Sequence, residues 1–224
     1  MWPTLGFSLI IAAVYVLVEL GVYLKWANVP ASDDPYLNGS LLAAVSIIAG
    51  VLCSLLILLF SKLRKSLSVK DYLGLHFIPR KDFLFWAMVF MGFGAIWNAL
   101  AYFLGRPIVP EVMVEIYQST SCIALLWVAL IVTAPVFEEL FFRGFLFKGI
   151  QGSRLGSVGA VVITSFSWAI VHRQYGWYEV VSIMILGGLL GFVRVRTNSV
   201  WMTIAAHMML NLVATFETRF YAGL

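Results

Sequence analysis

The sequence predicts an all-α fold, a polytopic transmembrane bundle of about seven helices, and two observations carry this prediction. The chain of 224 residues is 62% hydrophobic and only 12% charged, a composition that excludes a soluble globular protein. Several of its apolar runs reach about 20 residues, the length that a helix needs to cross a hydrocarbon core of about 30 Å. They lack the alternating segments of about ten residues that would indicate a transmembrane barrel.

Three apolar runs in the N-terminal half predict the first three helices, at Leu5–Leu24, Ser40–Phe60 and Phe83–Leu104. A polar stretch rich in Pro, Asp, Asn and Gly lies between the first two helices and marks a loop. Between the second and the third, Val69–Phe77 is predicted to lie along the membrane surface as a short amphipathic segment. The same connection is the most basic segment of the chain and contains Lys62, Arg64, Lys65, Lys70, Arg80 and Lys81.

Four further helices are predicted in the C-terminal half. The fourth runs from Ser121 to Ile150, the fifth ends at His172, the sixth ends near the stretch "RVRTNS", and the seventh contains His207 and Asn211. The loop before the fourth helix, which holds two glutamates, is predicted to lie outside the cell. We expect a single membrane domain, residues 1–224, because no repeat, low-complexity segment or linker divides the chain.

Basic residues identify the connections that face the cytoplasm. Lys148 and Arg154 mark the turn after the fourth helix, and Arg194 and Arg196 mark the turn after the sixth. Because the basic connections alternate along the chain, we predict a cytoplasmic N-terminus, an outside C-terminus and a retained first helix. The short loops are typical of a prokaryotic plasma-membrane protein. The net charge of +4 therefore reflects topology, and the expected partner is the lipid bilayer and not nucleic acid.

The two cysteines, Cys53 and Cys122, lie within or at the edge of apolar runs and show no paired spacing. Both are predicted to be small buried apolar residues, and neither a disulfide nor a cysteine metal site is expected.

Polar residues gather in the C-terminal helices at positions that are predicted to lie inside the membrane, where a polar side chain costs free energy. An ionisable side chain at the bilayer centre costs on the order of 3 kcal/mol, so such residues normally face the bundle interior and serve a function. The residues concerned are Glu138, Glu139 and Arg143 on the fourth helix, His172 at the end of the fifth, and His207 and Asn211 on the seventh. Counted at 1.5 Å per residue from the cytoplasmic turns, Glu138, His172, His207 and Asn211 lie at depths of about 13 to 24 Å and can converge at one level.

Spacing separates the two adjacent glutamates. Glu139 and Arg143 are four residues apart and share a helix face, which favours an ion pair between them. Glu138 points about 100° away from that face and is the freer carboxylate. Pro135 removes a backbone hydrogen bond just before the acidic pair, so it should kink or loosen the helix and make room for water or a substrate.

Each of these residues also has a structural interpretation when it is taken alone. The glutamate–arginine pair is typical of a buried ion pair, His172 of a hydrogen-bonding residue at a helix end, and Asn211 of an interhelical contact. Separate structural roles explain less well why a carboxylate, two imidazoles and an amide occur at one depth. We therefore predict that Glu138, His172, His207 and Asn211 line a single wet cavity and form a functional site.

The order and spacing of these residues on three helices resemble the CPBP family of intramembrane endopeptidases. This family includes the type II CAAX prenyl proteases and bacteriocin-processing or self-immunity proteins of the Abi group. The resemblance covers about Ser121 to Phe216, so 121–216 is the expected catalytic core and 1–120 holds the N-terminal helices. The motifs that carry it are Glu138-Glu139-x-x-x-Arg143, an aromatic residue four positions before His172, and His207-x-x-x-Asn211.

The resemblance implies a hydrolase that cleaves a peptide bond by a metal-free mechanism and without a cofactor. Glu138 and His172 would activate a water molecule, and His207 with Asn211 would stabilise the oxyanion. Glu139 and Arg143 would orient the site. The substrate would be a peptide or protein, either embedded in the membrane or lipidated.

Three further features bear on this resemblance. Gly187, Gly188 and Gly191 resemble the glycine-rich helix of the family, in which glycines let neighbouring helices approach closely. Trp168 stands where most relatives have Phe, and its larger indole should narrow the substrate pocket. Eight helices, the number in the eukaryotic relatives, are the alternative to the seven predicted here.

Other functions use the same residues. Glu138, His172 and His207 also make the ligand set of a hydrolytic zinc ion, with Glu139 as the base, although the chain lacks a His-Glu-x-x-His helix. Buried polar groups also serve proton relays and transporters, but no inverted repeat supports transport. A non-catalytic immunity or scaffold protein is the remaining alternative.

Overall fold

The computed structural model describes residues 2–26, 38–64, 67–221 and 223, and these residues form helices and connecting turns without a β-strand. The loop predicted between the first two helices and the basic residue Lys65 fall largely or wholly outside this range. The N-terminal helices are α1 (Trp2–Trp26), α2 (Gly39–Leu63), α3 (Val69–Leu73), α4 (Arg80–Phe103) and α5 (Glu111–Gln118). The C-terminal helices are α6 (Ile123–Trp127), α7 (Ala134–Glu139), α8 (Phe147–Gln151), α9 (Gly156–Val171), α10 (Trp177–Thr197) and α11 (Val200–Tyr221).

The predicted transmembrane bundle is confirmed. Within the described ranges, six helical segments are long and apolar enough to cross a membrane, and one of them is the continuous segment Ile123–Gln151 that joins α6, α7 and α8. The shorter apolar helix α9 has 16 residues, about 24 Å at 1.5 Å per residue, and corresponds to the predicted fifth helix; a seventh membrane crossing by α9 stays a prediction. The chain is therefore an integral multi-pass membrane protein.

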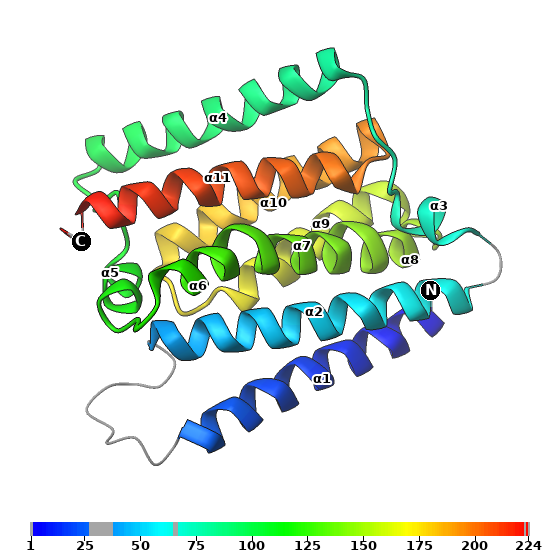
Figure 1. Cartoon of the computed structure of the whole chain (residues 1–224). Helices are drawn as coiled ribbons and strands as arrows, with labels where there is room; N and C mark the ends of the chain where they lie inside the picture. Colours follow the sequence, from blue (N-terminus) through cyan, green and yellow to red (C-terminus); the bar gives the residue numbers. More distant parts are fainter. Residues whose placement is uncertain (1, 27–37, 65–66, 222, 224) are drawn as a thin grey trace.

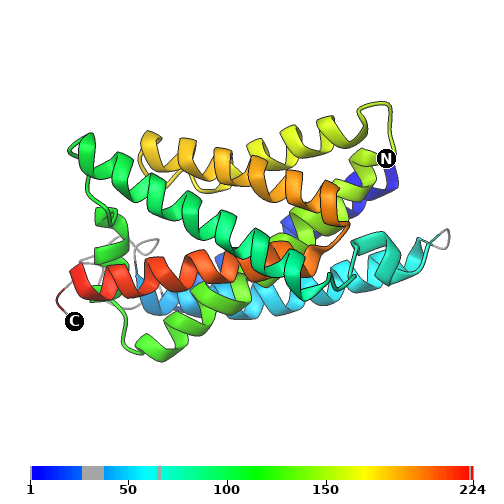
Figure 2. The same cartoon turned by 90° about the horizontal axis from the view of Figure 1, so that it is seen from above.

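The helices run side by side along one direction, and α1 and α4 lie on opposite sides of the bundle (Figure 1). The segment Ile123–Gln151 and α11 occupy the middle between them. Turning the bundle shows α9 and α10 as a pair on another face, next to α4 (Figure 2). The central position of Ile123–Gln151 buries the residues that the sequence singled out and brings them next to α9, α10 and α11.

The basic connections lie at one end of the bundle, as the alternating pattern predicts. The turn that joins α8 to α9, the turn that joins α10 to α11, and the segment with α3 are all at the right-hand end of Figure 1. Which side of the membrane this end faces stays a prediction.

One basic residue at this end has a different role from the one predicted. Arg194 is only 1% exposed, so it does not contribute a surface charge. Its guanidinium donates to the backbone carbonyls of Arg143 and Leu73, at 3.0 and 3.3 Å, and to the side chain of Asn198 at 2.6 Å. A buried guanidinium with several donors can satisfy carbonyls that would otherwise lack a partner. Arg194 therefore joins three parts of the chain and is a structural residue.

Local sequence signals explain where several helices begin and end. The Asn38 side chain accepts hydrogen bonds from the backbone N–H groups of Ser40 and Leu41 and caps α2. Ser68 caps α3 in the same way, and α3 ends at Gly74, whose φ of 75° is left-handed and suits glycine. The other short turn, between α10 and α11, uses Asn198 with φ of 49°, because asparagine tolerates this region better than most residues.

The structure adds detail to two predictions about the loops and contradicts a third prediction, about Cys122. The segment Val69–Phe77 is helical at Val69–Leu73, where Tyr72 and Leu73 are buried and Tyr72 hydrogen-bonds Thr4; its position along the membrane surface stays a prediction. The loop after α4 contains the helix α5, an amphipathic segment of eight residues that was not predicted as a helix. Cys53 is buried as predicted, but Cys122 is exposed at the start of α6; both are free thiols.

Candidate active site

The helical segment Ile123–Gln151 carries both adjacent glutamates and changes its winding around them. Residues Val128–Thr133 and Leu140–Leu146 are π-helical, and the α-helical turn with Pro135, Glu138 and Glu139 lies between them. Proline lacks a backbone N–H and cannot close a regular turn, so the loosening predicted at Pro135 is observed as these wider turns. π-Helical turns shift the angle between successive side chains and are frequent at functional sites.

Glu139 belongs to a fully buried charge network. Its Oε1 atom accepts a hydrogen bond from Nη1 of Arg143 at 2.8 Å, and both side chains are 0% exposed, so the predicted ion pair is confirmed. The same oxygen lies 3.1 Å from Nδ1 of His207 on α11. Because a carboxylate oxygen only accepts, this contact places a proton on Nδ1 of His207. We call Glu139, Arg143 and His207 the buried charge network.

Trp168 lies at the centre of the predicted residues. Its indole is 2% exposed, and Nε1 donates a hydrogen bond of 2.5 Å to Oε2 of Glu138. The Arg143 guanidinium lies over the ring, 4.3 Å from its centroid, in a cation–π contact. The rings of His172 and His207 meet the indole edge-on, with centroids 5.3 and 5.2 Å away. Glu138, His172 and His207 are therefore neighbours through one indole.

His172 ends α9 and is held from two directions. Nδ1 lies 2.8 Å from the backbone carbonyl oxygen of Trp168. A carbonyl oxygen only accepts, so Nδ1 carries the proton, and Nε2 of the neutral ring keeps its lone pair. The ring of Tyr175 stacks on His172, with centroids 6.2 Å apart and planes within 16°. This arrangement gives His172 a defined orientation and a nitrogen that can accept a proton.

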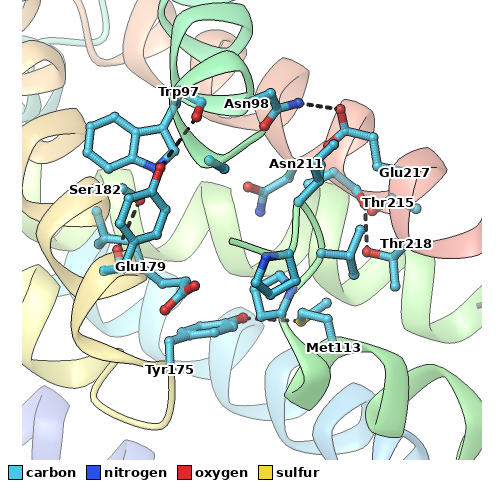
Figure 3. A pocket seen from close by; sticks show the side chains of 18 of the residues that line it. Trp97, Asn98, Met113, Tyr175, Glu179, Ser182, Asn211, Thr215, Glu217 and Thr218 are labelled. Carbon is cyan, nitrogen blue, oxygen red and sulfur yellow. Dashed lines mark hydrogen bonds between the residues drawn. The ribbon is translucent and has the colours of Figure 1, made fainter. Parts of the chain in front are cut away.

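Asn211 faces a different part of the structure, one turn beyond His207. Its side-chain nitrogen donates to the backbone carbonyl of Leu130 at 2.8 Å, within the π-helical segment. Asn211 also lines a cavity of about 240 Å³, which Figure 3 shows from close by. Glu138, His172 and His207 are not among the residues that line this cavity. Of the four predicted residues, Asn211 is therefore the one that lines this cavity, and a single wet cavity shared by all four stays a prediction.

Sequence reasoning undervalued two residues. It treated Trp168 as a bulky wall of the pocket, whereas its N–H group is a donor to Glu138 that a phenylalanine would lack. It did not identify Tyr175, which stacks on His172 and lines the cavity with Asn211. The position of Trp168 four residues before His172 on one helix was the available signal, because side chains at this spacing share a face.

The glycine-rich helix allows the close packing that the sequence predicted. A Cβ atom on Gly187 would lie 3.1 Å from Ser165 on α9 and 3.1 Å from Nη2 of Arg143. On Gly191 it would lie 3.0 Å from Val161. Both distances are shorter than an ordinary van der Waals contact, so α10 approaches α9 and the buried charge network closely because these residues lack a Cβ.

The geometry gives little support to the zinc alternative. In the ranges that the structure describes, no group of three His, Cys, Asp or Glu side chains is arranged to hold a metal ion. Nδ1 of His207 contacts Glu139, Nδ1 of His172 contacts a carbonyl, and Glu138 contacts the Trp168 indole. The three proposed ligands therefore surround an aromatic ring and do not converge on one point.

Comparison with known proteins agrees with the site. Residues 120–213 match the family model of the type II CAAX prenyl endopeptidases, described as Rce1-like. No curated protein and no solved structure is similar enough to match the chain. The matched segment contains all the predicted site residues, namely Glu138, Glu139, Arg143, Trp168, His172, His207 and Asn211.

Proposed function

Because residues 120–213 match the family model of the Rce1-like type II CAAX prenyl endopeptidases, we propose that this membrane protein is an intramembrane endopeptidase with Glu138 as its catalytic carboxylate. The observation that carries the proposal is the arrangement of Glu138, His172 and His207 around the buried indole of Trp168. Membrane helices rarely hold such groups together without a function.

Glu138 and His172 would activate the attacking water molecule. Oε2 of Glu138 accepts the Trp168 hydrogen bond, so Oε1 is the oxygen that would take a proton from water. Nε2 of His172 keeps a lone pair and would accept or relay a proton. The hydroxide equivalent would attack the peptide carbonyl, and the proton would then pass to the leaving amine.

His207 and Asn211 would stabilise the oxyanion that forms when the carbonyl carbon is attacked and the negative charge develops on the carbonyl oxygen. Nδ1 of His207 is engaged by Glu139, so Nε2 can donate only when the ring is an imidazolium. Asn211 has a second amide hydrogen besides the one donated to Leu130. Glu139 and Arg143 would thus act by holding His207 and not by touching the substrate.

An apolar groove supports a hydrophobic substrate. It has a volume of about 490 Å³, lies between the start of α4 and the first half of α11, and includes Phe83, Trp201 and Met202. Its wall also contains Val136 and Met208, which neighbour the buried charge network in the sequence. A membrane-embedded or lipidated peptide would place its hydrocarbon part here.

The proposal is tested by comparing the peptides released from membrane proteins by the purified protein and by its Glu138→Gln variant in nanodiscs. The variant should lose cleavage by about three to four orders of magnitude, because a glutamine cannot accept the proton. Glu115→Gln, which changes an exposed glutamate of α5, is the matched control and should cleave normally. Equal cleavage by Glu138→Gln and the wild type would contradict the proposal and favour a non-catalytic role.

A further inference from the structure

The cavity next to Asn211 has the composition of a binding site and not of a packing defect. Its volume of about 240 Å³ is several times the roughly 30 Å³ that one water molecule occupies. It lies between α4, α5, α10 and α11, and polar and aromatic side chains surround it (Figure 3). The side chains that matter below are Trp97, Asn98, Tyr175, Glu179, Asn211 and Glu217.

Two carboxylates from different helices face this cavity. Glu179 comes from the first turn of α10, and Glu217 comes from the last turns of α11. Glu217 accepts a hydrogen bond of 2.6 Å from the Asn98 amide, which holds it in place. In the described part of the chain, neither carboxylate has a cation within ion-pair distance, and no Lys or Arg lines the cavity. The cavity therefore carries uncompensated negative charge.

One cation among the described residues contacts the wall of the cavity without lining it. The Arg106 guanidinium lies over the rings of Trp177 and Tyr178, 4.9 and 5.7 Å from their centroids. Tyr178 is itself a lining residue, so the aromatic wall already attracts a cation on its outer face. The Trp97 and Tyr175 rings offer further aromatic surface inside the cavity.

Tyr175 connects this cavity to the candidate catalytic residues. Its ring stacks on His172, and its hydroxyl contacts the sulfur of Met113, another lining residue. Burial, together with the carboxylates of Glu138 and Glu179, raises the pKa of Tyr175 to about 12. The hydroxyl therefore stays protonated at neutral pH, and Tyr175 contacts His172 while it lines the cavity.

We propose that this cavity is a specificity pocket that binds a positively charged side chain, lysine or arginine, of the peptide substrate. The inference rests on the proposed function, because Asn211 belongs both to the cavity and to the predicted oxyanion site. A cationic side chain would pair with Glu179 and Glu217 and lie against the aromatic rings. Its backbone would then be held beside Asn211 and His172.

Binding to the Glu138→Gln variant in nanodiscs tests the pocket without depending on cleavage. The probes are fluorescent peptides that share one parent sequence. At each position in turn, the parent residue is replaced by lysine, by its neutral analogue norleucine or by glutamate. At one position the lysine peptide should bind about tenfold more tightly than the norleucine peptide, as a new charge pair predicts. Adding Glu179→Gln should abolish this preference, whereas adding Glu115→Gln, outside the pocket, should leave it unchanged.

A variant that reverses the charge of Glu179 distinguishes a lost pocket from a misfolded protein. Glu179→Lys should transfer the preference at the same position from lysine to glutamate, a gain that an unfolded protein cannot show. Lack of any preference among the three peptides in the parent variant, or a preference that survives Glu179→Gln, would overturn the inference. Failure of the endopeptidase proposal would give a different result. The peptides would then bind with the expected preference, but the wild-type protein would not cleave them.

Discussion

Glu138 and Glu139 are the same residue type at adjacent positions, yet their surroundings differ in every respect. Glu139 is fully buried and shares one oxygen between Arg143 and His207. Glu138 is half-buried and has the Trp168 indole as its hydrogen-bond donor. A helical step of 100° separates a carboxylate that is held in a buried ion pair from one that is partly exposed. The proposed function assigns the first glutamate to the structure and the second to the chemistry.

The largest effect is expected from breaking the buried charge network. Arg143→Met leaves Glu139 without its cation in a dry site, which should cost about 3–5 kcal/mol of unfolding free energy. Replacing both residues in Glu139→Met/Arg143→Met removes the stranded charge, so the double variant should recover part of that loss. Chemical unfolding in detergent micelles measures both. A double variant less stable than Arg143→Met would show that the pair itself stabilises the fold.

Asn211 offers a test on the catalytic side of the comparison. Removing one oxyanion donor typically costs a factor of about 10²–10³ in rate. Asn211→Ala should therefore lower kcat by about two orders of magnitude and leave KM nearly unchanged, because the contact forms only in the transition state. Steady-state kinetics with a cleavable peptide separate the two constants. A change in KM alone would assign Asn211 to substrate binding.

Trp168 distinguishes orientation of the carboxylate from simple packing. Trp168→Phe keeps an aromatic ring but removes the N–H that donates to Glu138. A hydrogen bond to a charged group is worth about 1.5–3 kcal/mol, so we expect about a tenfold lower cleavage rate with an unchanged fold. Cleavage assays with circular dichroism as the folding control test this. Wild-type rates would mean that the indole only fills space.

Chelation is expected to have the smallest effect. Since the described His and carboxylate side chains do not converge on a metal position, exhaustive dialysis against a strong chelator should leave cleavage unchanged. Metal analysis of the active protein is the companion measurement. Loss of activity that zinc restores would revive the alternative in which Glu138, His172 and His207 bind the metal.

The sequence predicted the membrane helices well because their signal is local. An apolar run of about 20 residues must span the bilayer whatever surrounds it, and basic connections mark one end. The same reasoning did not predict the helix α5 or the extent of the helix within Val69–Phe77, where contacts with the rest of the protein decide the structure. Arg194 is an example of this limit. In the sequence it counts as a basic residue that marks a cytoplasmic connection, but in the structure it is buried and donates hydrogen bonds to backbone carbonyls of distant segments.

The contacts among the predicted site residues were predictable from the sequence only in part. Helical spacing identified the Glu139–Arg143 pair and separated Glu138 from it. Spacing did not reveal that His207 would contact Glu139, because that contact joins helices 68 residues apart in the chain. It also missed Tyr175, which follows α9 in a turn and reaches His172 only through the fold. Tertiary packing decides such partners.

Thermal unfolding of Glu138→Gln and Glu139→Gln in the same nanodiscs tests the central claim most directly and needs no substrate. The account predicts that Glu138→Gln melts within a degree or two of the wild type, roughly the shift of a surface change. Glu139→Gln should melt several degrees lower, because Arg143 and His207 lose their shared anion. Equal melting temperatures for the two variants, or a larger loss for Glu138→Gln, would contradict the division between a structural and a reactive glutamate.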